Sequence, residues 1–212
     1  MTRLNLPRLY AILDVNTAIE HHWEPLELAR TYLAGGARLL QVRSERVGSA
    51  GLLVLCDAMV EEGHRSEAMI IANDRVDVAV LSGSDGVHVG QSDLPVMAVR
   101  SVIGDRSIVG LSTHTTEQVD AALQEPVSYI AVGPVFSTST KFTNYKPVGL
   151  ELVRYAARRA DGVPIVAIGG ITLDSASGVM NAGASSVAVV SDLLVGGDPE
   201  GRVRGYIAAL GR

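Results

Sequence analysis

The chain of 212 residues has a single cysteine and no long apolar run. Cys56 alone cannot form an internal disulfide, and one cysteine is typical of a protein from a reducing compartment. No stretch approaches the roughly 18–20 apolar residues that a membrane-spanning helix needs. The first residues also lack the apolar region and cleavage site of a signal peptide. We therefore expect a cytoplasmic protein without a membrane partner.

The chain also has little of what nucleic-acid-binding proteins use. Aromatic residues make up 4% of it, too few for platforms on which bases stack. The formal net charge is −5, with acidic and basic residues interspersed, whereas a nucleic-acid-binding domain usually has a basic patch. We expect no nucleic-acid partner.

Apolar sequence is abundant: 47% of the residues are hydrophobic, enough for one well-buried domain over residues 1–212. Short runs of Val, Ile, Leu and Ala alternate with helical patterns. Such nearly continuous apolar runs are typical of parallel strands buried on both faces. We predict strands at Leu9–Leu13, Leu39–Arg43, Ala68–Ala72, Gly86–Val89, Ser107–Leu111, Tyr129–Val132, Pro164–Ile168 and Ser186–Val190.

Helical periodicity fills the intervals between these runs. We predict helices at Pro25–Leu33, Gly51–Glu62, Arg75–Leu81, Pro95–Val102, Glu117–Leu123, Leu150–Ala160, Ser175–Asn181 and Glu200–Leu210. Strands that alternate with helices indicate a parallel sheet with right-handed crossovers. The fold class is therefore α/β, and the expected architecture is a single (β/α)8 TIM barrel. An open doubly wound sheet is the alternative, which the missing G-x-G-x-x-G motif after the first strand disfavours.

In such barrels the active site is built from the loops that follow the strands. Asn73 and Asp74 follow the third predicted strand, and Asp93 follows the fourth. Two carboxylates beside an amide suit Mg²⁺, a hard cation that prefers oxygen ligands. The alternative is that each aspartate caps the helix after it. Capping does not explain why both should meet at one end of the sheet.

Further polar side chains follow the second and fifth strands. Gln41 and Arg43 are two residues apart and so share a face of their strand. A buried arginine needs an anion to pair with, so we expect a bound one at Arg43. The alternative is a surface arginine at a frayed strand end. Ser112 and His114 follow the fifth strand, where His114 is either a proton carrier or an orienting loop residue. His88 lies within the fourth strand, and we interpret it as a hydrogen-bonded histidine of the core or the rim.

A second group of residues has no acidic members and suits a phosphate. Its hydroxyl-rich run follows the sixth strand, glycines follow the seventh, and Val190-Ser191 follow the eighth; the residues are Thr138, Ser139, Thr140, Gly170, Val190 and Ser191. Lys141, next to the hydroxyl-rich run, could serve the first region or bridge the two. In these barrels a phosphate commonly binds backbone N–H groups of the last two loops. The alternative is a flexible loop and helix-entry glycines. Two anion-binding regions at one barrel mouth suggest two small phosphorylated substrates, one of them a diphosphate neutralised by Mg²⁺.

Several long motifs carry a resemblance that covers almost the whole chain. They are LYAILD, QVR, ANDRVDVA, DGVHVGQSDLP, GLSTH, YIAVGPVFSTSTK, VGLE, PIVAIGGI and GASSVAVVS. In these motifs and their order the chain resembles the thiamine-phosphate synthase family. That family is a TIM barrel that joins a pyrimidinylmethyl diphosphate to a thiazole phosphate and releases pyrophosphate.

The resemblance implies a role for each matching residue. Gln41, Arg43, Asn73, Ser112 and Lys141 would hold the pyrimidine diphosphate, with Arg43, Ser112 and Lys141 closest to the chemistry. Asp74 and Asp93 would bind Mg²⁺, and Thr138, Ser139, Thr140, Gly170, Val190 and Ser191 would hold the thiazole phosphate. The reaction would proceed by loss of pyrophosphate to give a pyrimidine cation that the thiazole nitrogen captures. Such chemistry needs charge neutralisation and placement but no protein nucleophile.

One position departs from the family pattern. Where the family has Q-x-R-x-K, this chain has Glu45 in the lysine position. A carboxylate about 4 Å from a diphosphate charge would cost up to about 4 kcal/mol at an effective dielectric of about 20. We expect Glu45 to turn away and Arg46 to substitute for the lysine; the alternative is an altered site.

Two other functions are compatible with part of the pattern. A thiazole-phosphate tautomerase would use the metal-free phosphate site and a base such as His114, but would leave Arg43, Asp74 and Asp93 without a task. A non-catalytic paralogue that binds thiamine precursors has Glu45 as its only support. A homodimer is possible for a barrel of this size.

Overall fold

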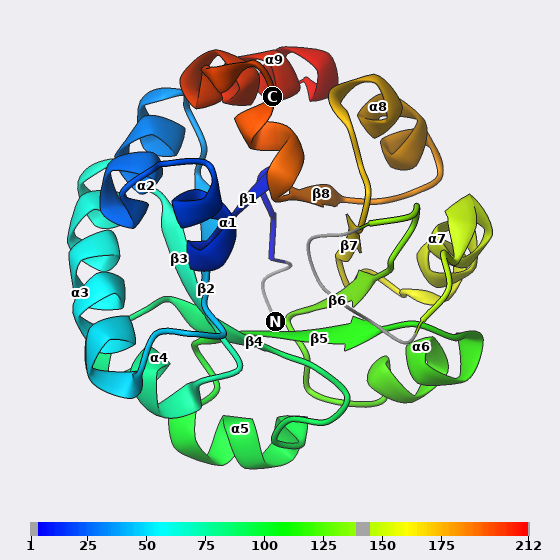
Figure 1. Ribbon diagram of the computed structural model, residues 1–212. Coiled ribbons are helices and arrows are strands. Elements are labelled where there is room, and N and C mark those ends of the chain that lie inside the picture. Colours follow the sequence, from blue (N-terminus) through cyan, green and yellow to red (C-terminus); the bar gives the residue numbers. More distant parts are fainter. Residues whose placement is uncertain (1–3, 139–144, 212) are drawn as a thin grey trace.

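The computed structural model describes residues 4–138 and 145–211. Its parallel strands form a closed barrel in chain order, with the last strand paired to the first (Figure 1). The strands are β1 (Leu9–Asp14), β2 (Leu39–Arg43), β3 (Met69–Asn73), β4 (Gly86–Val89), β5 (Ile108–Thr113), β6 (Tyr129–Val132), β7 (Ile165–Ile168) and β8 (Ser186–Val189). The predicted TIM barrel is thereby confirmed, and β2, β4 and β6 begin and end where the sequence places them.

Helices surround the barrel on all sides (Figure 1). They are α1 (Val15–Glu20), α2 (Pro25–Ala34), α3 (Ser49–Arg65), α4 (Val76–Ser82), α5 (Val96–Ile103), α6 (Thr116–Ala122), α7 (Gly149–Arg159), α8 (Leu173–Asn181), η1 (Ser191–Gly197) and α9 (Pro199–Leu210). The sequence prediction missed α1 and η1. Both are short and directly follow a strand, so neither shows an amphipathic repeat. In the described ranges, no helix combines the length and apolar character needed to cross a lipid bilayer.

Alternate residues of each strand face two different cores. In β1, Leu9, Ala11 and Leu13 pack with buried helix residues in the outer core. Tyr10 and Ile12 pack instead with interior residues of the other strands. This follows from the two-residue period of a strand, which turns successive side chains to opposite faces. Polar side chains on the interior face therefore converge near the barrel axis.

Strand register decides which of these polar residues become neighbours. Asp14 at the end of β1 lies opposite Arg43 at the end of β2. Asn73 lies opposite His88, which lies opposite Gly110 on the next strand. The ends of four neighbouring strands thus bring their side chains to one mouth of the barrel.

Candidate active site

The strand ends and the loops after them line a pocket of about 600 Å³. A cavity of this size suits a small-molecule ligand. It brings together the predicted site residues Gln41, Arg43, Asn73, Asp74, Asp93, Ser112, Thr138, Gly170, Val190 and Ser191. The predicted residues Ser139, Thr140 and Lys141 lie outside the described residues.

Arg43 is buried at the pocket wall and already has an anionic partner in the chain. Its Nη1 donates to Oδ2 of Asp14 at 2.5 Å. The other oxygen of Asp14 accepts from the backbone N–H of Thr17 at 2.8 Å and so caps α1. A buried charge requires such a partner. The expectation that the buried Arg43 needs a bound anion is therefore wrong, because Asp14 supplies the anion.

Glu45 also binds Arg43. Its carboxylate accepts from Nη2 of the guanidinium, while the Glu45 side chain itself is 61% exposed. The expectation that Glu45 turns away from this site is wrong. Arg46 is exposed and is not among the described residues that line the pocket, so it does not take the place of the family's lysine there. Arg43 is thus held between two carboxylates.

The acidic residues after β3 and β4 do not cap helices. In the described chain, α4 and α5 both begin without a side-chain cap. Asp74 has a φ of 62°, and its backbone N–H donates to the carbonyl of His88 at 2.7 Å. Aspartate tolerates this left-handed conformation better than most residues. Its Oδ2 accepts from Nδ2 of Asn73 at 2.7 Å. Oδ2 of Asp93 accepts from the N–H of Gly90 at 2.7 Å, which closes its own loop.

This donor set fits a divalent cation that binds together with a phosphorylated ligand. Asp74 and Asp93 line the same pocket from loops of neighbouring strands, and Asn73 adds an amide oxygen. Among the described residues, no group of three or more His, Cys, Asp or Glu side chains could hold a metal by itself. Mg²⁺ usually takes one or two carboxylates and completes its shell with waters and substrate phosphates. The arrangement therefore suits a divalent cation that completes its shell with ligand phosphates and waters better than it suits a closed metal site.

The two histidines near the site are both hydrogen-bonded. His88 is buried, and its ring contacts the hydroxyls of Tyr129 and Ser112 at 2.9 and 2.8 Å. The prediction of a core or rim histidine is confirmed. His114 donates from Nδ1 to the carbonyl of Gly133 at 2.6 Å and stacks on Tyr145 with ring centroids 3.8 Å apart. Of its two predicted roles, these contacts favour the orienting one.

Glycine is required at the loop after β7. Gly170 has a φ of 63°, and a Cβ built there would lie 2.4 Å from the carbonyl oxygen of Ser137. Gly169 has a φ of 100°, and its Cβ would lie 2.5 Å from Cα of Pro134. Only glycine accepts both the left-handed backbone and the close approach of the neighbouring loop. The backbone of residues 169–170 thus lines the pocket directly.

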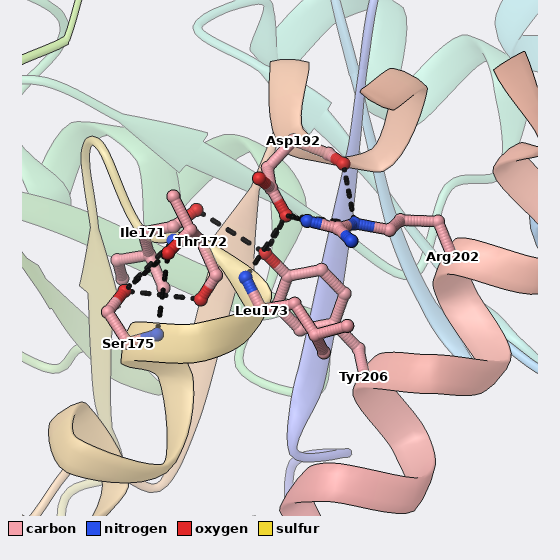
Figure 2. A network of polar contacts seen from close by, with 7 residues as sticks. All are labelled: Ile171, Thr172, Leu173, Ser175, Asp192, Arg202 and Tyr206. Carbon is pink, nitrogen blue, oxygen red and sulfur yellow. Dashed lines mark hydrogen bonds and ion pairs between the residues drawn. The ribbon is translucent and has the colours of Figure 1, made fainter. Parts of the chain in front are cut away.

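The loops after β7 and β8 are tied together by Asp192, which sequence reasoning missed (Figure 2). Its Oδ2 accepts from the N–H of Leu173, from Nη2 of Arg202 and from the Tyr206 hydroxyl, at 3.1, 2.8 and 2.5 Å. Arg202 and Tyr206 lie one turn apart on α9. The only sequence signal for this network is an acidic residue directly after Ser191, because its partners are distant in the chain.

At the same loop, Thr172 and Ser175 form a capping box at the start of α8. Leu173, the first residue of α8, is the one whose N–H reaches Asp192. The helix start after β7, η1 after β8 and α9 therefore share one set of hydrogen bonds. This set supports the backbone on both sides of the predicted phosphate site.

Comparison with known proteins agrees with this geometry. The family model described as thiamine monophosphate synthase matches residues 9–193. The thiamine-phosphate synthase of Koribacter versatilis is 41% identical over 209 residues, covering 98% of this chain and 97% of the relative. That of Roseiflexus castenholzii is 37% identical over 196 residues, covering 92% and 85%.

A solved structure resembles the whole chain as well. Thiamine phosphate pyrophosphorylase from Pyrococcus furiosus superposes with a TM-score of 0.86 at 27% identity, covering 96% of this chain and 95% of that one. Both the sequence and the fold match over nearly the full length. The chain belongs to the thiamine monophosphate synthase family.

Proposed function

We propose that the chain is a transferase that makes thiamine phosphate. It couples 4-amino-2-methyl-5-(diphosphooxymethyl)pyrimidine with thiazole phosphate and releases pyrophosphate. The single observation that supports this proposal is one pocket lined by both groups of predicted binding residues. Arg43, Asp74 and Asp93 come from the ends of β2–β4 and the loops after them, and Gly170 and Ser191 come from the loops after β7 and β8.

We infer that each group binds one substrate. Gln41, Arg43, Asn73 and Ser112 bind the pyrimidine diphosphate, together with Lys141. Asp74 and Asp93 bind Mg²⁺. The thiazole phosphate is bound by the second group of residues, Thr138, Ser139, Thr140, Gly170, Val190 and Ser191. When bound, Mg²⁺ would neutralise charge on the departing pyrophosphate.

The chain's own residues contribute placement and charge. Arg43 donates hydrogen bonds to the diphosphate, and its guanidinium is kept in position by Asp14. The glycine backbone after β7 holds the acceptor substrate near the reacting carbon, and such placement supplies much of the rate enhancement when two molecules must meet. No protein nucleophile is required.

Turnover of the two precursors tests the proposal. Purified protein is incubated with both phosphorylated substrates, and pyrophosphate is measured with Mg²⁺ and with EDTA. We expect release that depends on both substrates and stops with EDTA. Asp93→Asn should lower kcat/KM by at least about 100-fold, as for removal of one strong electrostatic interaction in a transition state. Asp105→Asn, which changes an exposed carboxylate outside the pocket, is the matched control.

The same assay separates the two other functions. A thiazole-phosphate tautomerase would turn over without the diphosphate substrate and would be indifferent to EDTA. The hydrogen bond from His114 to Gly133 gives that histidine an orienting task and weakens the case for it as the base. A non-catalytic paralogue would bind both precursors and release no pyrophosphate.

Three further expectations accompany this function. We infer that residues 1–212 act as one domain, because the barrel uses strands from both ends of the chain in one sheet. A buried, unpaired Cys56 is compatible with a cytoplasmic location. A homodimer stays a prediction that sedimentation or light scattering can test.

A further inference from the structure

A chain of hydrogen bonds crosses the barrel interior from β2 to β5. Gln41 Nε2 donates to the Tyr10 hydroxyl at 2.9 Å, and the Tyr10 hydroxyl contacts that of Tyr129 at 3.0 Å. The Tyr129 hydroxyl in turn contacts His88 Nδ1 at 2.9 Å, and His88 Nε2 contacts Ser112 Oγ at 2.8 Å. Gln41 and Ser112, at its two ends, both line the pocket. Tyr129, the middle residue of this series of hydrogen bonds, is fully buried.

The middle link exists only because residue 110 is glycine. Gly110 lies on β5 opposite both His88 on β4 and Tyr129 on β6. A Cβ built at Gly110 would lie 2.4 Å from the Tyr129 hydroxyl and 2.6 Å from His88 Nδ1. The two side chains therefore meet across the space that a side chain of β5 would fill. The backbone φ at Gly110 is not in the left-handed region, so this glycine makes room for the contact and does not serve a turn.

The hydrogen bonds can all run in one direction, with every hydroxyl hydrogen donated to an acceptor. The Gln41 amide nitrogen can only donate, so the Tyr10 oxygen accepts from it. Among the described residues, the partners of the Tyr10 hydroxyl are Gln41 and Tyr129, so its hydrogen is used only if it points to Tyr129. Tyr129 then donates to Nδ1 of His88, and Nε2–H of His88 donates to Ser112. Burial raises the pKa of both tyrosines, so each keeps the hydroxyl hydrogen that it donates in this series of hydrogen bonds.

This direction determines what the two ends offer to a ligand. With Nε2 of Gln41 bound to Tyr10, its Oε1 is an acceptor. With Oγ of Ser112 accepting from His88, its hydroxyl hydrogen is a donor. If the Gln41 amide turned over, every link would reverse and both ends would exchange roles. In either state the ends present one donor and one acceptor.

We propose that Tyr10, Tyr129 and His88 form a relay that fixes His88 as the Nε2–H tautomer and matches Gln41 and Ser112 to an aminopyrimidine. This inference rests on the proposed function. The matched ligand is a ring with an exocyclic amine at one edge and a ring nitrogen at another. Tyr10, Tyr129 and His88 are thus positioning residues that act through Gln41 and Ser112. An oxopyrimidine, with a carbonyl in place of the amine, presents the opposite pattern. It could be paired only if the Gln41 amide turned over and every link reversed, so it should bind more weakly than the aminopyrimidine.

The tautomer of His88 tests the relay without any substrate. In protein with ¹⁵N-labelled histidine, we expect NMR to show His88 protonated on Nε2 alone. Gln41→Glu replaces a donor by a carboxylate that only accepts, so Tyr10 must donate to it and the links reverse. The His88 proton should then move to Nδ1, three hydrogen bonds from the substitution. Tyr129→Phe removes the middle hydroxyl, and in that background Gln41→Glu should leave His88 unchanged.

Three outcomes would overturn the relay. They are a wild-type His88 with its proton on Nδ1 or on both nitrogens, no response to Gln41→Glu, or the same response in the Tyr129→Phe background. The last would mean that the glutamate charge acts through space. None of these spectra needs turnover. The relay can therefore be refuted while the transferase activity is confirmed, and the activity can be refuted while the relay is confirmed.

Kinetics provide a second measurement if the double variant does not fold. Tyr129→Phe should raise KM for the aminopyrimidine diphosphate roughly tenfold, the effect of about one mismatched hydrogen bond, and leave KM for thiazole phosphate within about twofold. Tyr155→Phe is the matched control, since its hydroxyl donates to Asp120 at 2.8 Å on the outer helices. Equal changes in both KM values would indicate a general loss of structure and contradict a positioning role.

Discussion

Nη1 of Arg43 and Oδ2 of Asp14 lie 2.5 Å apart, and the two side chains are 9% and 3% exposed. The pair joins the ends of β1 and β2, where the two residues lie opposite each other in the sheet register. Asp14 also caps α1, so one carboxylate fixes both a helix start and a guanidinium at the pocket wall. The position of Arg43 is therefore decided by the fold before any ligand binds.

Asp14→Asn should destabilise the protein and weaken diphosphate binding. Asparagine keeps an oxygen for the Thr17 N–H but loses the charge that compensates Arg43. Removing one partner of a buried pair costs about 3–5 kcal/mol, and the remaining contact with Glu45 favours the lower end. Urea unfolding measures the change. Thr17→Val, which removes only the hydroxyl contact to Asp14, is the control; equal midpoints for wild type and Asp14→Asn would contradict the role of the pair.

Glu45→Gln and Glu45→Lys should leave kcat/KM for the pyrimidine diphosphate unchanged or raise it. Both variants remove a carboxylate that occupies one donor group of Arg43. Stability should hardly change, because an ion pair with an exposed partner contributes about 0–1 kcal/mol. Steady-state kinetics with the diphosphate varied measure the effect, with Glu61→Gln on α3 as a distant control. A large fall in kcat/KM would assign Glu45 a positive role in the reaction.

Asp192→Asn should raise KM for thiazole phosphate and leave KM for the pyrimidine diphosphate nearly unchanged. The carboxylate holds Leu173, Arg202 and Tyr206 around the loops after β7 and β8 (Figure 2). Hydrogen bonds to a charged group contribute about 1.5–3 kcal/mol each, so we expect roughly a tenfold or larger change in KM. Tyr206→Phe removes one of the bonds and should have a smaller effect. A change confined to the diphosphate substrate would refute this assignment of the loops.

Cys56 should resist alkylation in the folded protein. Its side chain is fully buried on α3, and burial, with a smaller contribution from the charge of Asp57, raises the pKa of the thiol to about 12. The reactive thiolate is therefore a very small fraction at pH 8, and the sulfur is not accessible. Mass spectrometry after iodoacetamide treatment should find no modification until denaturant is added. Rapid labelling of native protein would show that α3 opens readily.

Part of the site could be predicted because strand ends impose an order on it. Polar residues directly after apolar runs, such as Asn73, Asp74 and Asp93, must gather at one mouth once the runs are parallel strands of a barrel. The repeated spacing of strands and helices specifies that barrel locally. Short elements without an amphipathic repeat, α1 and η1, were not predictable in this way.

The pairing of side chains was not predictable from spacing. Arg43 with Asp14, and Asp192 with Arg202, join residues whose proximity depends on register and on closure of the sheet. The relay from Gln41 to Ser112 requires Gly110 between two longer side chains on neighbouring strands, and nothing in the local sequence marks that glycine.

The sequence by itself determined the barrel, the family and which loops face the pocket, because hydrophobic period and motif order are local properties of the chain. The tertiary structure decided that Asp14 already pairs with Arg43 and that Glu45 also binds the Arg43 guanidinium. It also decided that His88 is one member of a series of hydrogen bonds from Gln41 to Ser112. Hydrogen bonds and ion pairs depend on distances of a few ångströms, and only a closed sheet in a defined register sets those distances.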